Sequence, residues 1–299
     1  MPFRIDETFG ISIISYHVSW CITTIFFIYT ISMFTSDLLP CYDTEHIMRV
    51  QEISSKSILT KTEIGGYDFC INPYIGCAHG CKYCYASFMK RFTGHTEPWG
   101  EFVDVKINAP QVLSKQLKKP RKGSVLIGTV TDPYQPLEKT YQITRECLKL
   151  LLERQMPVRI LTRSPLCTRD IDLFREFHDI EVGLSIATDN EDIKQLFEPH
   201  SPSIASRIAA LKKIHDVGVK TYAFLGPILP LDPEHIIDMI TGLADSVLID
   251  RLNYPKKVVS IYRHSGLEDC MRESYFHAMG SKLKEELEKR NIPVSLLFT

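Results

Sequence analysis

A strong excess of charge of either sign is absent from this sequence of 299 residues. Lysine and arginine together number 35, and aspartate and glutamate number 36, so the formal net charge is −1. A chain this balanced carries no overall basic signal for nucleic acid. Internal repeats and low-complexity tracts are absent too. With 44% hydrophobic residues, the chain fits one large α/β domain or two smaller domains.

A disulfide framework is also not indicated, although cysteine occurs nine times. The number is odd, most of the cysteines are scattered, and a chain of this length needs no disulfides to form a stable core. Metal or redox use in a reducing compartment fits better, so we expect a cytoplasmic protein. The cysteines are residues 21, 41, 70, 77, 81, 84, 147, 167 and 270.

Charged residues are missing from residues 11–34, a stretch long enough to span a bilayer. Only one basic residue, Arg4, precedes it, so the positive start of a signal peptide is lacking. We expect a hydrophobic leader over residues 1–47 and one domain, with a short C-terminal extension, over residues 48–299. Three hypotheses for the leader stay open: a membrane anchor, a buried helix, or a gene-model extension with Met48 as the true start.

Apolar β-type runs alternate with helical patterns from Met48 onward. Strands are predicted over residues 69–75, 124–130, 158–162, 181–187, 220–225, 246–252 and 294–298. Helices are predicted over residues 110–117, 143–154, 169–177, 203–217, 233–243 and 280–290.

Strands that are apolar on both faces and separated by helices indicate a parallel sheet. Six or seven such units favour an α/β fold of the partial (β/α)6-type TIM barrel class. A doubly wound sheet is the alternative. Proline-rich segments at 132–136 and 226–233 fall directly after strands, where α/β folds carry their ligand-binding loops.

Three cysteines crowd the stretch NPYIGCAHGCKYCYA, residues 72–86, which follows the first predicted strand. Cys77, Cys81 and Cys84 have the spacing Cys-x3-Cys-x2-Cys. Three thiolates can bind three irons of a 4Fe–4S cluster and leave the fourth iron open for a substrate or cofactor. Structural zinc sites use four ligands, commonly as two pairs, and ferredoxin-type clusters need a fourth cysteine.

Alternatives to such a cluster stay open at this point. His79 or His95 could complete a Cys3His zinc site, which would make the chain a non-catalytic metal-binding protein. Cys147 lies within a predicted helix, which makes it a poor fourth ligand, and Cys70 lies in a strand, where it would pack as a small hydrophobic residue.

The cysteine spacing, with the aromatic residue Tyr83 before the third cysteine, closely resembles the signature of radical S-adenosylmethionine (SAM) enzymes. The resemblance implies that SAM binds the open iron and that an electron from the cluster cleaves it. The resulting 5′-deoxyadenosyl radical would abstract hydrogen from an unknown substrate. An external one-electron reductant of the flavodoxin or ferredoxin type is implied as a partner.

Further segments resemble the spore photoproduct lyase-like branch, whose members are often labelled DNA repair photolyases. The similarity runs from about Ser54 to Pro233, and lyase-like repair of damaged DNA is therefore an alternative function. The segments are GTVTDPYQPLE (128–138), LTRSPLCTRD (161–170) and the region of Glu198, Pro199 and Arg207.

The superfamily resemblance also implies roles for residues after the predicted strands. Thr131 and Asp132 would accept hydrogen bonds from the SAM amino group, and Ser185 and Thr188 would contact the SAM ribose. Arg207 would bind the SAM carboxylate as a bidentate donor. Each residue has an ordinary structural alternative, such as a turn, a local backbone bond or a surface position.

Aromatic and charged residues near the cysteines complete the predicted site. Tyr83 would stack near adenine or pack beside the cluster, and Tyr85 is a candidate hydrogen-atom relay by resemblance to the lyase. Arg163 follows a predicted strand and could lie near substrate. Glu138 and Glu198 could contact SAM or merely flank helices.

One departure from the lyase puts DNA repair in doubt. The lyase depends on a further cysteine downstream of the cluster, and none occurs here between Cys84 and Cys147. Cys167 follows a predicted strand and is the remaining candidate for this catalytic role, with a buried thiol as its alternative.

Basic residues give only thin support for nucleic acid as a substrate. One run precedes the second predicted strand, on the face away from the predicted site: Lys115, Lys118, Lys119, Arg121 and Lys122. Another group, Arg251, Lys256 and Lys257, lies at the end of the sixth strand, on the side of the site.

Overall fold

Parallel strands organise the structure, a computed structural model that describes residues 48–119 and 121–298. Its larger sheet has eight strands in the order β11-β10-β9-β8-β7-β6-β3-β2, and only the β2–β3 pair is antiparallel. The strands are β2 (Thr60–Lys61), β3 (Phe69–Ile71), β6 (Val125–Ile127), β7 (Val158–Thr162), β8 (Ile180–Ser185), β9 (Lys220–Leu225), β10 (Ser246–Ile249) and β11 (Val294–Leu296).

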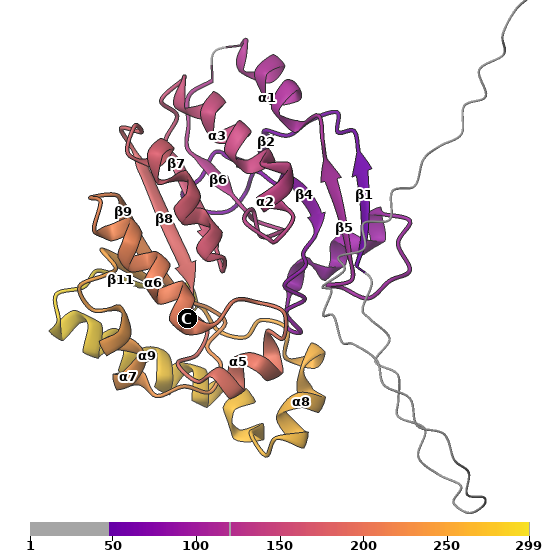
Figure 1. The fold of residues 1–299 in the computed structure, drawn as a ribbon. Coiled ribbons are helices and arrows are strands. Elements are labelled where there is room, and N and C mark those ends of the chain that lie inside the picture. Colours follow the sequence, from indigo (N-terminus) through magenta and orange to yellow (C-terminus); the bar gives the residue numbers. More distant parts are fainter. Residues whose placement is uncertain (1–47, 120, 299) are drawn as a thin grey trace, which may run out of the picture. The chain divides into compact units, whose positions relative to one another are not determined.

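Neighbouring strands of this sheet follow one another along the chain, and a helix crosses between most of them (Figure 1). Among the described residues, β2 and β11 each pair with a single neighbour, so the sheet is open. A parallel sheet of consecutive units with an open side is the partial barrel that the sequence predicts. The fold class is therefore confirmed.

Helices cover the outer side of these strands (Figure 1). Side-chain caps set several of their starts: Asn190 caps α5, Ser203 caps α6, and Asp232 caps α7 just before its Pro233. The helices are α1 (Ala109–Leu117), α2 (Glu138–Tyr141), α3 (Ile143–Leu152), α4 (Ile171–Phe174), α5 (Glu191–Phe197), α6 (Ile204–His215), α7 (Pro233–Ile240), α8 (Val259–His264) and α9 (Glu273–Lys289).

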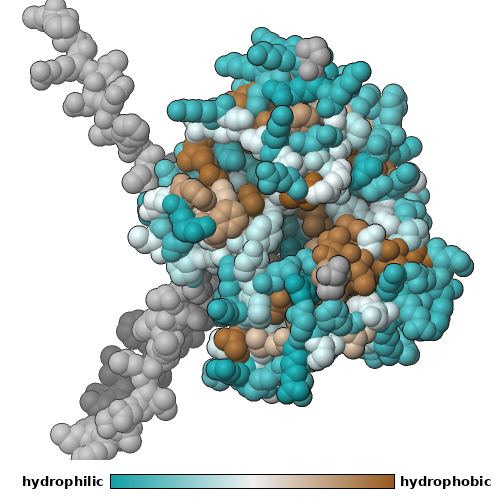
Figure 2. Space-filling view, turned by 180° about the vertical axis from the view of Figure 1, so that it is seen from behind, coloured by the Kyte–Doolittle hydropathy of each residue, from teal (hydrophilic) through white to brown (hydrophobic). Residues whose placement is uncertain are grey.

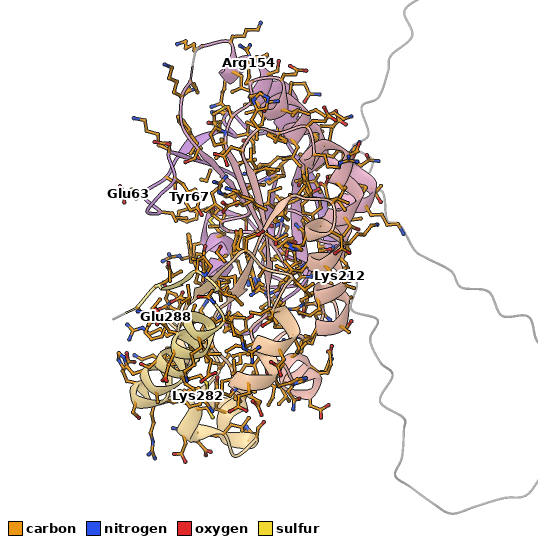
Figure 3. All side chains as sticks on the ribbon, turned by 90° about the vertical axis from the view of Figure 1, so that its left-hand side faces the viewer. Glu63, Tyr67, Arg154, Lys212, Lys282 and Glu288 are labelled. Carbon is orange, nitrogen blue, oxygen red and sulfur yellow. The ribbon has the colours of Figure 1, made fainter. Side chains whose placement is uncertain are left out.

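The core lies between the sheet and these helices. Helix α6 packs there against β8 and β9, and α3 packs against α1. Each buried aliphatic side chain contributes about 1.5–3 kcal/mol to stability. Fully buried examples are Val158, Ile160, Val182, Leu184, Leu148, Leu151, Leu211 and Ile214. Charged residues such as Lys212, Lys282 and Glu288 lie on the outer helices (Figure 3).

A second, three-stranded sheet has the order β1-β5-β4, formed by β1 (Arg49–Ile53), β5 (Phe102–Lys106) and β4 (Tyr74–Gly76). The prediction of one strand over 69–75 is therefore wrong, because β3 ends at Ile71 and β4 belongs to the other sheet. Asn72 and Pro73 make the break: Pro73 has no N–H to donate, and the Asn72 side chain accepts hydrogen bonds from the loop after β6.

None of the described helices combines the length and the apolar character needed to cross a membrane. The stretch 11–34 and the proposed start at Met48 concern the leader, and residues 1–47 lie outside the described residues. Figure 2 shows one face of the molecule, on which hydrophobic residues gather around a central hollow.

Candidate active site

A loop of eight residues, 77–84, carries the three clustered cysteines and is called the cysteine loop below. It follows β4 directly, so the strand fixes where the loop begins. Gly76, at φ +87°, makes this exit possible, since a Cβ there would lie 2.3 Å from the Phe102 carbonyl oxygen. Cys77 and Cys81 are buried, Cys84 is half-buried, and all three thiols are free.

Four hydrogen bonds tie the cysteine loop and its approach to other parts of the barrel. Gly76 O accepts from Thr131 Oγ1 (2.6 Å), and Ala78 N donates to Gln135 Oε1 (2.9 Å). Lys82 N donates to Phe197 O (2.9 Å) at the end of α5. Cys84 O accepts from Lys257 Nζ (2.6 Å). The loop is therefore held in place by segments that follow β6, β8 and β10.

The donor set of the loop suits thiolate ligands. The backbone N–H of His79 donates to the Cys77 sulfur, and those of Ala86 and Ser87 donate to the Cys84 sulfur. Burial raises the pKa of all three thiols, that of Cys81 to about 12. Deprotonation of such buried thiols requires a compensating positive charge, which a bound metal supplies.

A cluster fits these residues better than a single ion does. One ion needs its ligands to converge on one point, whereas in a 4Fe–4S cube each cysteine binds a different iron. Both candidate zinc histidines instead face carboxylates: His79 Nε2 lies 3.2 Å from Asp132 Oδ2, and His95 Nε2 lies 2.7 Å from Asp104 Oδ1.

Tyr83 lies in a buried charged network beside the cysteines. Its hydroxyl donates to Glu198 and accepts from Arg163 Nη2 at 2.9 Å, while Arg163 Nε donates to Glu198 Oε1 at 3.1 Å. Arg207 donates to the other oxygen of Glu198. Burial alone would raise the pKa of Glu198, but Arg207 and Arg163 outweigh it and hold the pKa well below its ordinary value.

Arg207 is fully occupied within the protein. Its side chain is 1% exposed, and each of its three nitrogens already donates to a protein oxygen. Partners besides Glu198 include the carbonyls of Pro202 and Ser185. The residue thus joins α6 to the end of β8, and its position is neither at the surface nor open to a ligand's carboxylate.

Asp132 and Thr131 lie on the loop after β6 and are buried. Asp132 accepts from Thr162 Oγ1 (2.6 Å) and from the backbone N–H groups of Tyr134 (2.9 Å) and Arg163 (2.8 Å). Burial opposes ionisation of this carboxyl, but His79 and these hydrogen bonds lower its pKa to about 2. Asp132 therefore connects the loop after β6 to the cysteine loop and to the end of β7.

Ser185 and Thr188 lie at the same carboxyl-terminal edge, after β8, and both are buried. Thr188 Oγ1 donates to Pro230 O at 2.6 Å, and Ser185 Oγ lies 3.4 Å from Gly226 O. The two hydroxyls thus bond to the loop after β9.

The two residues predicted to be catalytic occupy contrasting places. Tyr85 is 43% exposed, its hydroxyl donates to Thr129 O, and its ring stacks on Tyr254 at 6.5 Å between centroids. Cys167 is fully buried in the 3-10 helix η2 (Pro165–Asp170). The structure brings Tyr85, but not Cys167, to the solvent-facing side of the cysteine loop.

Sequence reasoning placed Lys257 on the side of the site but missed that Lys257 and Gln135 hold the cysteine loop. The segment containing Gln135 was singled out, yet nothing marks its amide as the partner of Ala78, 57 residues away. Glu138, by contrast, is structural: it accepts from Tyr74, Thr144 N and Arg169. The remaining site roles stay predictions.

Comparisons with known proteins bear on the family and the fold. A model of the radical SAM superfamily matches residues 71–241. An uncharacterized protein of Methanocaldococcus jannaschii is 38% identical over 230 residues, which cover 76% of this chain and 86% of that protein. A radical SAM Nα-GlyT isomerase of Pseudomonas phage M6 is 23% identical over 207 residues, covering 67% of this chain and 40% of that protein.

Solved structures show the same fold at low sequence identity. Spore photoproduct lyase complexed with dinucleoside spore photoproduct superposes with a TM-score of 0.62 at 13% identity, covering 83% of this chain and 82% of that one. Streptococcus suis SuiB bound to S-adenosylmethionine gives 0.51 at 14% identity, covering 77% of this chain and 50% of SuiB. Since the superfamily model matches more than half of the sequence, the chain belongs to the radical SAM superfamily.

Proposed function

We propose that this radical SAM enzyme binds a 4Fe–4S cluster through Cys77, Cys81 and Cys84 and acts by hydrogen abstraction from an organic substrate. When bound, the cluster and SAM supply a reductive cleavage that yields a 5′-deoxyadenosyl radical. The cysteine loop carries the proposal. It holds three free thiols, with backbone N–H donors aimed at two of the sulfurs.

Arg163, rather than Arg207, is the residue proposed to bind the SAM carboxylate. Glu198 and Tyr83 hold its Nε and Nη2, while Nη1 has no hydrogen-bond partner among the described residues. A guanidinium fixed on one side and open on the other is preorganised for an anion. The charge of Arg163 also acts on Cys81 and Cys84, so it lies close to the cysteine loop.

The other predicted cofactor residues are proposed to act by shaping the edge of the barrel. Tyr83 is buried within the cysteine loop and orients Arg163 through its hydroxyl. Thr131 and Asp132 connect the cysteine loop to the loop after β6, and Ser185 and Thr188 fix the segments after β8 and β9. SAM would lie across this edge, where ligands bind in parallel α/β folds.

Tyr85 remains the proposed hydrogen-atom relay. It follows the last cysteine, is partly exposed, and keeps its proton, since burial raises its pKa to about 12. A neutral phenol is the form that can donate a hydrogen atom. Cys167 is a weaker proposal for this role because its thiol lies in the core.

Metal analysis and spectroscopy test this proposal. Anaerobic reconstitution should give the iron and sulfide content of one 4Fe–4S cluster per chain, and added SAM should change the electron paramagnetic resonance spectrum of the reduced cluster. Cys81→Ala should lose the cluster, whereas Cys270→Ala, a half-buried cysteine elsewhere, should keep it. Stoichiometric zinc, with no iron retained, would contradict the proposal.

A second candidate is lyase-like action on damaged nucleic acid. Its support is the similarity to a lyase solved with a dinucleoside photoproduct and to a phage GlyT isomerase. Transfer of label from a photoproduct-containing oligonucleotide into 5′-deoxyadenosine would support this candidate. The same assay without transfer would leave only the general radical SAM activity.

A further inference from the structure

Four aromatic rings are exposed directly beside the cysteine loop. Three belong to the 3-10 helix η1 (Tyr85–Phe92) and the fourth follows β10, and their exposed fractions run from 37% to 71%. Neighbouring rings contact one another in the order Tyr254, Tyr85, Phe88 and Phe92. The first two pairs are stacked, at 6.5 and 6.4 Å between centroids, and Phe92 meets Phe88 edge-on at 6.3 Å. These rings, called the ring surface below, are Tyr85, Phe88, Phe92 and Tyr254.

All charged residues of the two short 3-10 helices at the ring surface, η1 and η3 (Pro255–Lys257), are basic. The guanidinium of Arg91 lies 5.8 Å from the Phe88 centroid and 6.0 Å from that of Phe92. Lys257 belongs to η3, and its Nζ lies 5.6 Å from the Tyr254 centroid. Neither η1 (YASFMKRF) nor η3 (PKK) contains an acidic residue, although the whole chain has a net charge of −1.

The ring surface lies beside the least buried of the three cysteines. Cys77 and Cys81 are buried, whereas Cys84 is half-buried and is followed immediately by Tyr85. Lys257 joins Cys84 to the ring surface, since its Nζ donates to the Cys84 carbonyl at 2.6 Å and also to the Ser87 hydroxyl. An electron that enters the protein at the ring surface would therefore reach the cysteine loop first at Cys84.

We propose that the ring surface is the docking site for an acidic one-electron carrier protein of the flavodoxin or ferredoxin type. The inference rests on the proposed function, because only a cluster at the cysteine loop needs such a partner. One electron leaves the reduced carrier, which becomes oxidised, and enters the cluster beside Cys84, which becomes reduced. The step breaks no covalent bond and moves no proton.

The size and chemistry of the ring surface favour a carrier protein over nucleic acid. Weak electron-transfer interfaces are small, and aromatic residues and arginine are enriched at interface centres. A cationic rim steers an acidic partner toward the apolar rings. Binding a nucleic-acid strand usually takes a longer track of phosphate contacts, and η1 and η3 together offer only Lys90, Arg91, Lys256 and Lys257.

The test compares two reductants on the reconstituted full-length protein. Reduced flavodoxin must dock, whereas photoreduced deazaflavin, a small neutral molecule, need not. The Arg91→Glu/Phe92→Ser double variant changes two exposed residues that do not touch the cysteines. We expect its rate of cluster reduction by flavodoxin to fall about tenfold or more and to lose its salt dependence. Its rate with deazaflavin should stay at the wild-type value.

Arg154→Glu is the matched control. Arg154 is exposed and lies before β7, at the end of the strands opposite the cysteine loop (Figure 3). This variant makes the same charge change, so its rate with flavodoxin should equal that of the wild type.

Three results would overturn the inference. A wild-type rate with flavodoxin in the Arg91→Glu/Phe92→Ser variant would show that the carrier docks elsewhere. If that rate is kept while binding of a single-stranded oligonucleotide is lost, the ring surface serves nucleic acid instead. Absence of cluster reduction by deazaflavin in the wild type would identify a failure of the proposed function itself, and the inference would fall with it.

Discussion

Arg163 is the side chain through which the structure most changes the site expected from the sequence. If Nη1 binds the SAM carboxylate, Arg163→Lys removes a planar fork that an ammonium cannot replace. The dissociation constant of SAM should rise about 10- to 100-fold, as expected for a lost hydrogen bond between charged groups worth about 1.5–3 kcal/mol. Isothermal titration calorimetry on the cluster-loaded protein measures it.

Arg159→Lys provides the control for this prediction. The Arg159 side chain has the same 19% exposure and also forms ion pairs, but with Asp179 and Glu181 at the amino-terminal end of the strands. Its substitution should leave SAM affinity unchanged. If Arg163→Lys and the wild type bind SAM with equal affinity, the SAM carboxylate does not bind to Arg163.

Glu198 is expected to be important for stability as well as for the site. Its carboxylate is 1% exposed and lies between Arg163 and Arg207, so Glu198→Gln leaves buried cationic groups without their counter-charge. Removing one partner of such a buried pair lowers the free energy of unfolding by roughly 3–5 kcal/mol. Chemical denaturation of the apoprotein measures the change.

The sign of the pH effect follows from the lowered pKa of Glu198. The stabilisation is present above the ordinary pKa of 4.5 and is lost as the pH falls through the lower pKa of the folded state. Glu181→Gln is the matched control, because Glu181 pairs with Arg159 in a more exposed place and should cost at most about 1 kcal/mol. Similar losses for the two variants would refute a special role for Glu198.

The cysteines could be identified from the sequence, whereas the arginines could not be told apart. Cysteine spacing is a local property, and the three thiols do lie on one loop. Which arginine can bind a ligand depends on whether neighbouring protein groups already accept hydrogen bonds from all of its nitrogens. Arg207 is saturated by Glu198, Pro202 and Ser185, and the contact with Ser185 forms only once α6 packs against the end of β8.

Among the larger elements, the sequence predicts the barrel strands well and the second sheet poorly. Strands such as β6, β8 and β9 stand out because nearly all their residues are buried, whereas the short, exposed β2 is not predicted. β1 (Arg49–Ile53) buries almost nothing, so its hydropathy gives no signal. In β5 (Phe102–Lys106), the buried Asp104 interrupts an apolar run, and only its contact with His95 explains its presence.

Two helices show similar limits. α5 (Glu191–Phe197) is mostly polar and is marked chiefly by its cap, Asn190. α9 begins at Glu273, seven residues before the predicted start at Gly280. Gly280 resembles a helix boundary but lies inside the helix, where a Cβ would come within 2.7 Å of the Phe298 ring.

The segment before β5 is expected to shape the cysteine loop through a contact between two glycines. Gly100 has φ +105°, and a Cβ there would lie 2.7 Å from the Cα of Gly80 in the loop. Gly100→Ala should therefore displace the cysteine loop and lower the iron bound per chain. It should also destabilise the fold by about 1–3 kcal/mol through the strained backbone.

Gly218→Ala separates the loss of stability from the loss of iron binding. Gly218 also has a positive φ, +79°, but no atom lies within 4 Å of its added Cβ. This variant should lose stability to a similar extent and still bind iron as the wild type does. Full iron binding by Gly100→Ala would contradict the role given to the glycine contact.

The molecule as a whole gathers residues from distant parts of the chain at one edge of an open barrel. Cys84 near its start and Lys257 near its end meet there, 173 residues apart. Arg163 and the exposed rings both lie beside this loop. Cofactor, substrate and reductant would thus all approach the same cysteine loop.

Formation of 5′-deoxyadenosine tests this account most directly. Reconstituted protein, reduced in the presence of SAM, should produce 5′-deoxyadenosine detectable by mass spectrometry. Cys84→Ala, treated identically, should produce none. A wild-type protein that holds a reducible cluster and binds SAM, yet yields no 5′-deoxyadenosine, would contradict the account.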